Sequence, residues 1–161
     1  MNDFEQRLND AISRGKNVAA NKVAAAQAAA LTEDQFRRLH TKYRLELCEH
    51  IERCMAKLPD HFPGFNVENV VSDRGWGTAV VRDDVQLKAG GRGSAFSRCE
   101  ITVRPYSSAH VIDIAARGTI RNKEVFQRGQ YQLLGEAQIQ VLAEQIDLWI
   151  LEYAELYAAR V

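Results

Sequence analysis

The spacing of apolar residues changes twice along this 161-residue chain, and that change constrains the fold more than any other feature. Steps of three and four residues run to about position 58, strict alternation follows from about 65 to 132, and helical spacing returns from about 136 to 159. Steps of three and four are typical of amphipathic helices, whereas alternation is typical of half-buried strands. The order predicts an α+β protein in which consecutive strands pair antiparallel.

The strongest local signal begins at Thr32. Thr32-Glu33-Asp34-Gln35 matches a capping box, in which the side chains of Thr32 and Gln35 each bond the other's backbone amide, and Leu31 and Phe36 fit a hydrophobic staple. The apolar residues that follow are spaced by three and four and form one stripe: Phe36, Leu39, Tyr43, Leu47, Ile51, Cys54 and Leu58. The stripe predicts a helix from Thr32 to Leu58, which Pro59 ends.

The segment before it, Asp3 to Ala30, is also helix-prone, with Phe4, Leu8 and Ile12 four residues apart. Gly15 suits the end of a helix and Asn17 the start of another, so the segment forms either one helix or two. Because almost nothing connects it to the next helix, we expect an antiparallel helical hairpin. Residues 1–58 are then a helical arm or hairpin, and residues 59–161 are the sheet with its closing helix, in one folding unit with the arm.

The middle of the chain predicts an antiparallel meander of about four to five strands. The candidate strands are 65–72, 76–82, 96–104, 109–120 and 123–132, and a further run, 85–88, either continues the second strand or pairs with it across an Asp83-Asp84 turn. Residues 89–94 are expected to form a loop. Alternation places Cys99, Ile101, Ile112 and Ile114 in the core and the arginines between them on the wet face.

The closing helix, from about Glu136 to Ala159, packs on the sheet through Ile139, Leu142, Ile146, Trp149, Ile150, Tyr153 and Tyr157. Leu148 to Leu151 widen its apolar stripe beyond what one sheet covers, so a second surface must meet it. That surface is either the N-terminal helices or another copy of the chain. The residues expected at an interface between two copies are Leu148, Trp149, Leu151, Leu8 and Ile12.

Charge is unevenly distributed although the formal net charge is zero. Ten basic and five acidic residues lie between Arg74 and Gln130, whereas five acids and one base lie between Tyr131 and Val161. The candidate anion-binding residues are Arg92, Arg98, Arg104 and Arg117, which suggest nucleic-acid binding as an alternative function. Glu100 and Asp113 share their face, however, so cross-strand ion pairs account for them equally well.

No catalytic residue, cofactor or metal is expected. The sequence has no nucleophile elbow, Walker loop or His-Glu-x-x-His motif, and the three cysteines have no disulfide-framework spacing. His50 and Cys54 are four residues apart on one helix and His61 follows, but no second Cys/His pair lies at zinc-finger spacing. The sequence therefore leaves enzymatic activity undecided and favours a protein that is not an enzyme.

The predicted function is a protein-protein interaction or assembly module that forms a homodimer through its helices, with another protein partner possible. A third alternative is a small-ligand pocket between the sheet and the closing helix. The N-terminus has no apolar signal segment, and the longest uncharged stretch there, Val23 to Thr32, is too short to span a membrane, so we expect a cytoplasmic protein without membrane contact.

The capping box provides the first test. Replacing Thr32 by alanine removes the hydroxyl that satisfies a free amide in the first helical turn, so Thr32→Ala should lower the free energy of unfolding by about 1 kcal/mol. Chemical denaturation of the variant and the wild type measures the difference. An unchanged denaturation midpoint would contradict the capping role.

Overall fold

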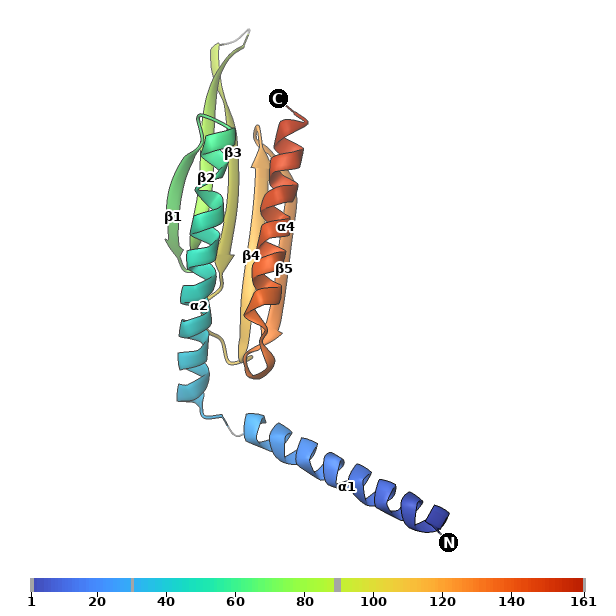
Figure 1. The fold of residues 1–161 in the computed structure, drawn as a ribbon. Coiled ribbons are helices and arrows are strands. Elements are labelled where there is room, and N and C mark those ends of the chain that lie inside the picture. Colours follow the sequence, from blue (N-terminus) through green and yellow to red (C-terminus); the bar gives the residue numbers. More distant parts are fainter. Residues whose placement is uncertain (1, 30, 89–90, 161) are drawn as a thin grey trace.

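A computed structural model describes residues 2–29, 31–88 and 91–160, without the side chains of residues 2, 24–29, 85–88, 91 and 92. Five strands form one antiparallel sheet in the order β1-β2-β3-β4-β5, so each strand pairs with its neighbour in sequence. Two helices, α2 and α4, lie side by side over one face of the sheet, and α1 extends away from it (Figure 1). The predicted α+β class, the meander and the closing helix packed on the sheet are confirmed.

The elements follow the predicted order with shifted ends. The helices are α1 (Asn2–Ala29), α2 (Glu33–Met55), α3 (Leu58–His61) and α4 (Ile139–Ala158), with a short 3₁₀ helix at Leu134–Glu136 before α4. The strands are β1 (Asn66–Ser72), β2 (Gly75–Lys88), β3 (Gly91–Val103), β4 (Val111–Ile120) and β5 (Lys123–Leu133).

The helix predicted from Thr32 has its capping box. Thr32 Oγ1 accepts a hydrogen bond from the Gln35 amide at 3.2 Å, and Gln35 Oε1 accepts one from the Thr32 amide at 2.9 Å. The helix ends at Met55, three residues earlier than predicted. Pro59 lies in the first turn of α3, where its missing N–H removes no helical hydrogen bond.

The N-terminal segment is one continuous helix, so Gly15 does not end it. The expected hairpin is not formed: α1 points away from α2, and the side chains of residues 3–23 are all exposed (Figure 1). The physical reason lies in α2, whose apolar residues Leu47, Ile51 and Met55 are buried against the sheet and α4. The opposite face of α2 carries mainly charged side chains around the exposed Leu45, so it offers α1 little apolar surface.

Of the two alternatives for the run 85–88, the structure shows that it continues β2, and Asp83-Asp84 forms no turn. Asp83 and Asp84 pair with Phe96 and Ala95 of β3 inside a long hairpin, and the carboxylate of Asp84 accepts a hydrogen bond from Arg82 Nε at 2.8 Å. Residues 91–94 of the expected loop belong to β3, and residues 89–90 lie outside the described part. Beyond the ends of β1 and β4 the hairpin continues as a two-stranded ribbon (Figure 1).

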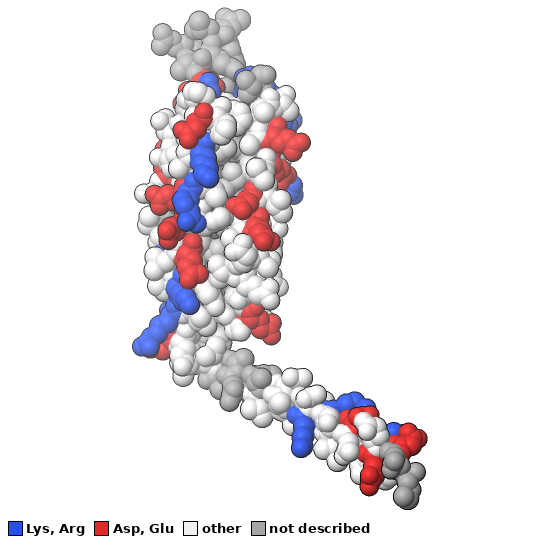
Figure 2. All heavy atoms as spheres, viewed as in Figure 1, with Lys and Arg blue, Asp and Glu red and all other residues white. Residues whose placement is uncertain are grey.

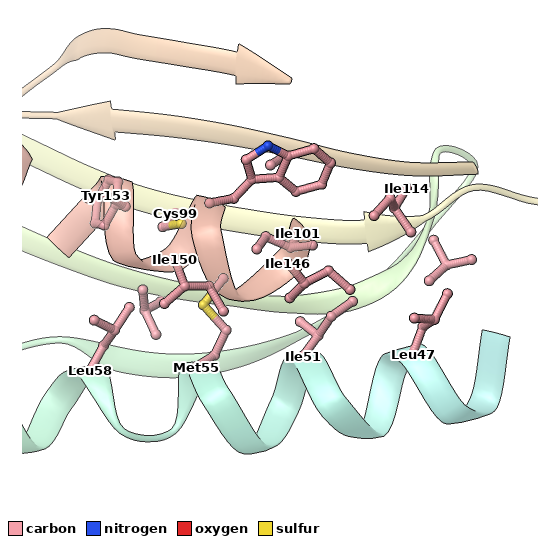
Figure 3. Close-up of a cluster of buried hydrophobic side chains, with 14 of the residues drawn as sticks. Leu47, Ile51, Met55, Leu58, Cys99, Ile101, Ile114, Ile146, Ile150 and Tyr153 are labelled. Carbon is pink, nitrogen blue, oxygen red and sulfur yellow. The ribbon is translucent and has the colours of Figure 1, made fainter. Parts of the chain in front are cut away.

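The core lies between the sheet and the two helices. Cys99, Ile101, Ile112 and Ile114 are fully buried, as the alternation predicts. Figure 3 shows residues of α2, of α4 and of the central strands pointing into this one layer. Its labelled members are Leu47, Ile51, Met55, Leu58, Cys99, Ile101, Ile114, Ile146, Ile150 and Tyr153. Within the described residues, no helix combines the length and apolar character needed to cross a membrane.

The core register gives a second test. Ile101→Ala should lower the free energy of unfolding by roughly 2–5 kcal/mol, because it removes buried atoms where no solvent can enter. Val71→Ala, at a side chain that is 76% exposed, is the control and should change stability by less than about 0.5 kcal/mol. Denaturant titration measures both. Equal effects of the two substitutions would contradict the register.

Candidate functional site

The five expected interface residues divide into exposed and buried ones. Leu8 and Ile12 on α1 are about half exposed, and Leu148 and Leu151 on α4 are 59% and 63% exposed. Trp149 is only 4% exposed and belongs to the core. The apolar residues from Leu148 to Leu151 therefore serve two sides of α4. Trp149 faces the core, whereas Leu148 and Leu151 face outward.

All the large apolar side chains of α1 that the structure describes lie on one side of the helix. At roughly 100° per residue they fall within about 140° of the helical circumference. We call this set the α1 apolar face; its members, 47–69% exposed, are Phe4, Leu8, Ile12, Val18 and Val23. Charged side chains gather near the N-terminal end of α1 and along α2 and α4 (Figure 2).

The outer, uncovered face of the sheet carries the predicted anion-binding arginines, and each described one is paired with acids. Arg98 contacts Glu68 at 3.1 Å and Glu100 at 2.9 Å. Arg104 contacts Asp113 at 3.3 Å, and Arg117 contacts Glu124 at 3.5 Å. The Arg92 side chain lies outside the described residues. These ion pairs offset much of the positive charge of the outer sheet face, which weakens the case for an anionic polymer there.

An apolar groove of about 590 Å³ runs between the C-terminal end of α2, α3 and α4. Leu58, Phe62, Ile150, Leu151 and Ala154 form its apolar walls. This location differs from that of the predicted ligand pocket, since the space between the sheet and α4 is filled by buried side chains such as Trp149 and Tyr153. Leu151 thus belongs both to the groove and to the outward surface of α4.

Three reactive side chains meet beside this groove. His50 and Cys54 come from consecutive turns of α2, and Asp147 comes from α4. His50 Nε2 lies 2.7 Å from Asp147 Oδ1, and Cys54 Sγ lies 3.5 Å from the same oxygen and 3.7 Å from His50 Nε2. Burial, and then the hydrogen bond to Asp147, raise the pKa of the Cys54 thiol, so the free thiol stays protonated at neutral pH.

A second polar cluster joins the start of α2 to the β3–β4 connection. The Glu33 carboxylate accepts hydrogen bonds from the Tyr106 hydroxyl and from His110 Nε2, and Phe36 stacks on the His110 ring. The hydrogen bonds from Tyr106 and His110 lower the pKa of Glu33. His40, 3% exposed, donates from Nε2 to the Arg104 carbonyl at 3.1 Å. Every group has a structural partner, so this cluster fixes α2 on the sheet.

Sequence reasoning identified two of the three residues in the cluster beside the groove. It paired His50 with Cys54 from their spacing and named His61, which lines the groove, but it missed Asp147. Asp147 is 97 residues from His50 in the chain. The one sequence feature that could have linked His50 to Asp147 is that each residue lies at the edge of the apolar stripe of its own helix. Comparison of the chain with protein-family models, with curated proteins and with solved structures finds no match.

His40 gives a test based on pH. Burial, and to a smaller extent the charge of Arg44, lower the pKa of His40 below its ordinary value of 6.5, whereas the Arg104 carbonyl opposes them. Below that pH the unfolded chain binds a proton that the folded chain does not, so the free energy of unfolding falls as the pH drops from about 7 to about 5.

His40→Gln keeps a donor for the Arg104 carbonyl but cannot titrate, so this variant should lose stability less steeply with falling pH than the wild type. His61→Gln, at an exposed histidine, is the control and should keep the wild-type slope. Urea denaturation at several pH values measures the slopes. Parallel curves for wild type and His40→Gln would contradict the assignment.

Proposed function

We propose that this protein is an assembly module that forms a homodimer through α1, with the two α1 helices packed antiparallel. The observation that carries the proposal is the α1 apolar face, which the rest of its own chain leaves exposed. Helices in proteins owe most of their stability to packing of an apolar face, and isolated helices are only marginally stable in water. A helix of 28 residues with such a face requires a partner.

The charges of α1 favour a second copy in antiparallel orientation. The N-terminal half, residues 2–15, contains three acids and two bases, whereas the C-terminal half, residues 16–29, contains two bases and no acid. The acids are Asp3, Glu5 and Asp10, and the bases are Arg7, Arg14, Lys16 and Lys22. Antiparallel packing sets each acidic half against the partner's basic half, whereas parallel packing sets like charges together.

The sizes of the side chains agree with the same orientation. Phe4, Leu8 and Ile12 are in the first half, and seven of the residues from 19 to 29 are alanines. Antiparallel packing brings the bulky half of one helix onto the small-residue half of the other, which lets the surfaces interlock.

Gly15 lies at the midpoint of α1, where a two-fold axis would cross the pair. It is helical, and a Cβ there would meet nothing within 4 Å in the single chain. A mid-helix glycine costs roughly 0.5–1 kcal/mol relative to alanine, so it needs another reason to be there. Close approach of the two helices at their crossing point supplies one.

The area is sufficient for a weak but specific dimer. A helix of 28 residues is about 42 Å long, and a contact strip about 12 Å wide buries about 500 Å² on each copy. The total of about 1,000 Å² is at the lower limit for a specific interface. Leu148 and Leu151 lie outside this contact and form a separate exposed apolar pair on α4.

Sedimentation equilibrium tests the dimer directly. The wild type should have the mass of two 18.1 kDa chains at micromolar concentration. Leu8→Glu/Ile12→Glu should yield the mass of one chain, because it places charges in the contact. Gln6→Glu/Asn17→Glu adds the same charges on the opposite side of α1 and should remain dimeric. A wild type with the mass of one chain would sink the proposal.

Oxidative cross-linking tests the orientation. In an antiparallel pair centred on Gly15, two cysteines at position 15 are adjacent, whereas two at position 8 are about 21 Å apart along the axis. Gly15→Cys should therefore form a covalent dimer and Leu8→Cys should not, since a disulfide needs Cα atoms within about 7 Å. The oxidised wild type is the control, because it shows how much covalent dimer the three native cysteines form by themselves. Cross-linking through position 8 would indicate a parallel pair.

A further inference from the structure

The cluster of His50, Cys54 and Asp147 has the geometry of three ligands around one point. The three donor atoms, imidazole Nε2, thiol Sγ and carboxylate Oδ1, all lie within 4.8 Å of one another. They come from two helices that the buried core holds in place, so the chain need not rearrange to bring them together. Convergence of nitrogen, sulfur and oxygen donors is what a transition-metal ion requires.

The hydrogen bonds within the cluster are directed at one atom. Asp147 Oδ1 lies 2.7 Å from His50 Nε2 and accepts from Cys54 Sγ at 3.5 Å. Both partners therefore direct a proton toward the same carboxylate oxygen. A divalent cation in that space binds all three donors at once: the proton of the Cys54 thiol is released to solvent, and the proton on His50 Nε2 is exchanged for one on Nδ1.

The spacing fits tetrahedral coordination closely. With metal–nitrogen and metal–oxygen distances of about 2.0–2.1 Å and a metal–sulfur distance of about 2.3 Å, tetrahedral ligand atoms lie about 3.4–3.6 Å apart. The separations of Cys54 Sγ from His50 Nε2 and from Asp147 Oδ1 are 3.7 and 3.5 Å. Only the separation between His50 and Asp147 must widen, by less than about 1 Å, as the hydrogen bond is replaced by two metal bonds.

We propose that His50, Cys54 and Asp147 form a binding site for a single Zn²⁺ ion. A thiolate and an imidazole favour zinc over Mg²⁺ and Ca²⁺, which prefer oxygen ligands alone. A deprotonated Cys54 and Asp147 carry two negative charges, which match the charge of the ion. Three protein ligands leave a fourth position for water, and it faces the groove, because Cys54 and Asp147 line the groove and His50 does not.

Charges near the site act in both directions: the acids of α4 favour a cation, whereas Arg53 and Lys57, whose charges both act on Cys54, oppose it. Between Ile139 and Ala158, α4 has four acidic residues and no basic one. Arg53 opposes binding, since its Nη2 lies 3.5 Å from His50 Nδ1, which must carry the proton once Nε2 binds the metal. The Arg53 side chain is exposed and can turn into solvent. Its replacement by alanine should leave zinc binding intact or strengthen it.

Calorimetric titration of the full, tag-free chain with Zn²⁺, after removal of metal with a chelator, tests the site. We expect one ion per chain at micromolar affinity or tighter and a rise in melting temperature, because the ion joins α2 to α4. Co²⁺ should give the near-ultraviolet absorption of a thiolate ligand and the intense visible bands of four-coordinate geometry.

Single-ligand variants assign the ion to these residues. Cys54→Ser, His50→Ala and Asp147→Asn should each weaken zinc binding by about 100-fold or more, and Cys54→Ser should also abolish the thiolate band. Cys48→Ser, on the same helix but outside the cluster, is the control and should change neither. Circular dichroism without metal verifies that each variant is folded.

Three results would overturn the proposal: no binding by the folded wild type, affinity that is unchanged in Cys54→Ser, or loss of binding in Cys48→Ser. Because the α1 apolar face contributes no ligand, Leu8→Glu/Ile12→Glu should bind zinc as the wild type does.

Discussion

The fold depends on covering one apolar sheet face with two helical stripes. The sheet presents Cys99, Ile101, Ile112 and Ile114 on the same side, and burial of such a face is the main stabilising contribution in a protein of this size. Neither α2 nor α4 is wide enough to cover five strands alone, so the two helices lie side by side. Their relative position is fixed by packing in the shared core, where Ile51 and Met55 join Ile146 and Ile150.

That arrangement also creates the cluster beside the groove. When the apolar stripes of α2 and α4 face the sheet, the residues that flank the two stripes come together where the helices adjoin. His50 and Cys54 on one helix therefore meet Asp147 on the other. The groove lies beside this junction, lined by the exposed Leu151 of α4 and by Phe62, which follows α3 and also packs on the core.

The same constraint leaves α1 without a partner in its own chain. The apolar stripe of α2 is occupied by the sheet and α4, and its outward face is mainly charged around Leu45, so α2 offers α1 little apolar surface. The five apolar side chains of α1 therefore stay exposed. The acid–base asymmetry of α1 and Gly15 at its midpoint fit a second copy of the same helix. The proposed assembly through α1 and the proposed metal binding between α2 and α4 involve separate surfaces, so each proposal can fail without the other.

Local chemistry made much of the fold predictable. The Thr32 capping box, the burial of Ile101 and the antiparallel meander follow from interactions between residues close in sequence or from a simple period. The sequence left two alternatives open where a local signal had two outcomes. Gly15 can end a helix or lie inside one, and Asp83-Asp84 can turn or pair, since Arg82 neutralises part of the charge that disfavours a strand.

By itself the sequence determined which residues form helices and strands and which face of each is buried, because those properties repeat with a fixed period along the chain. Only the tertiary structure decided that α1 stands free, that Trp149 is buried, and that the arginines of the sheet are paired. It also placed Asp147 beside His50 and Cys54. The physical reason is that contacts between residues far apart in sequence depend on how helices are placed on the sheet, and no local period records that placement.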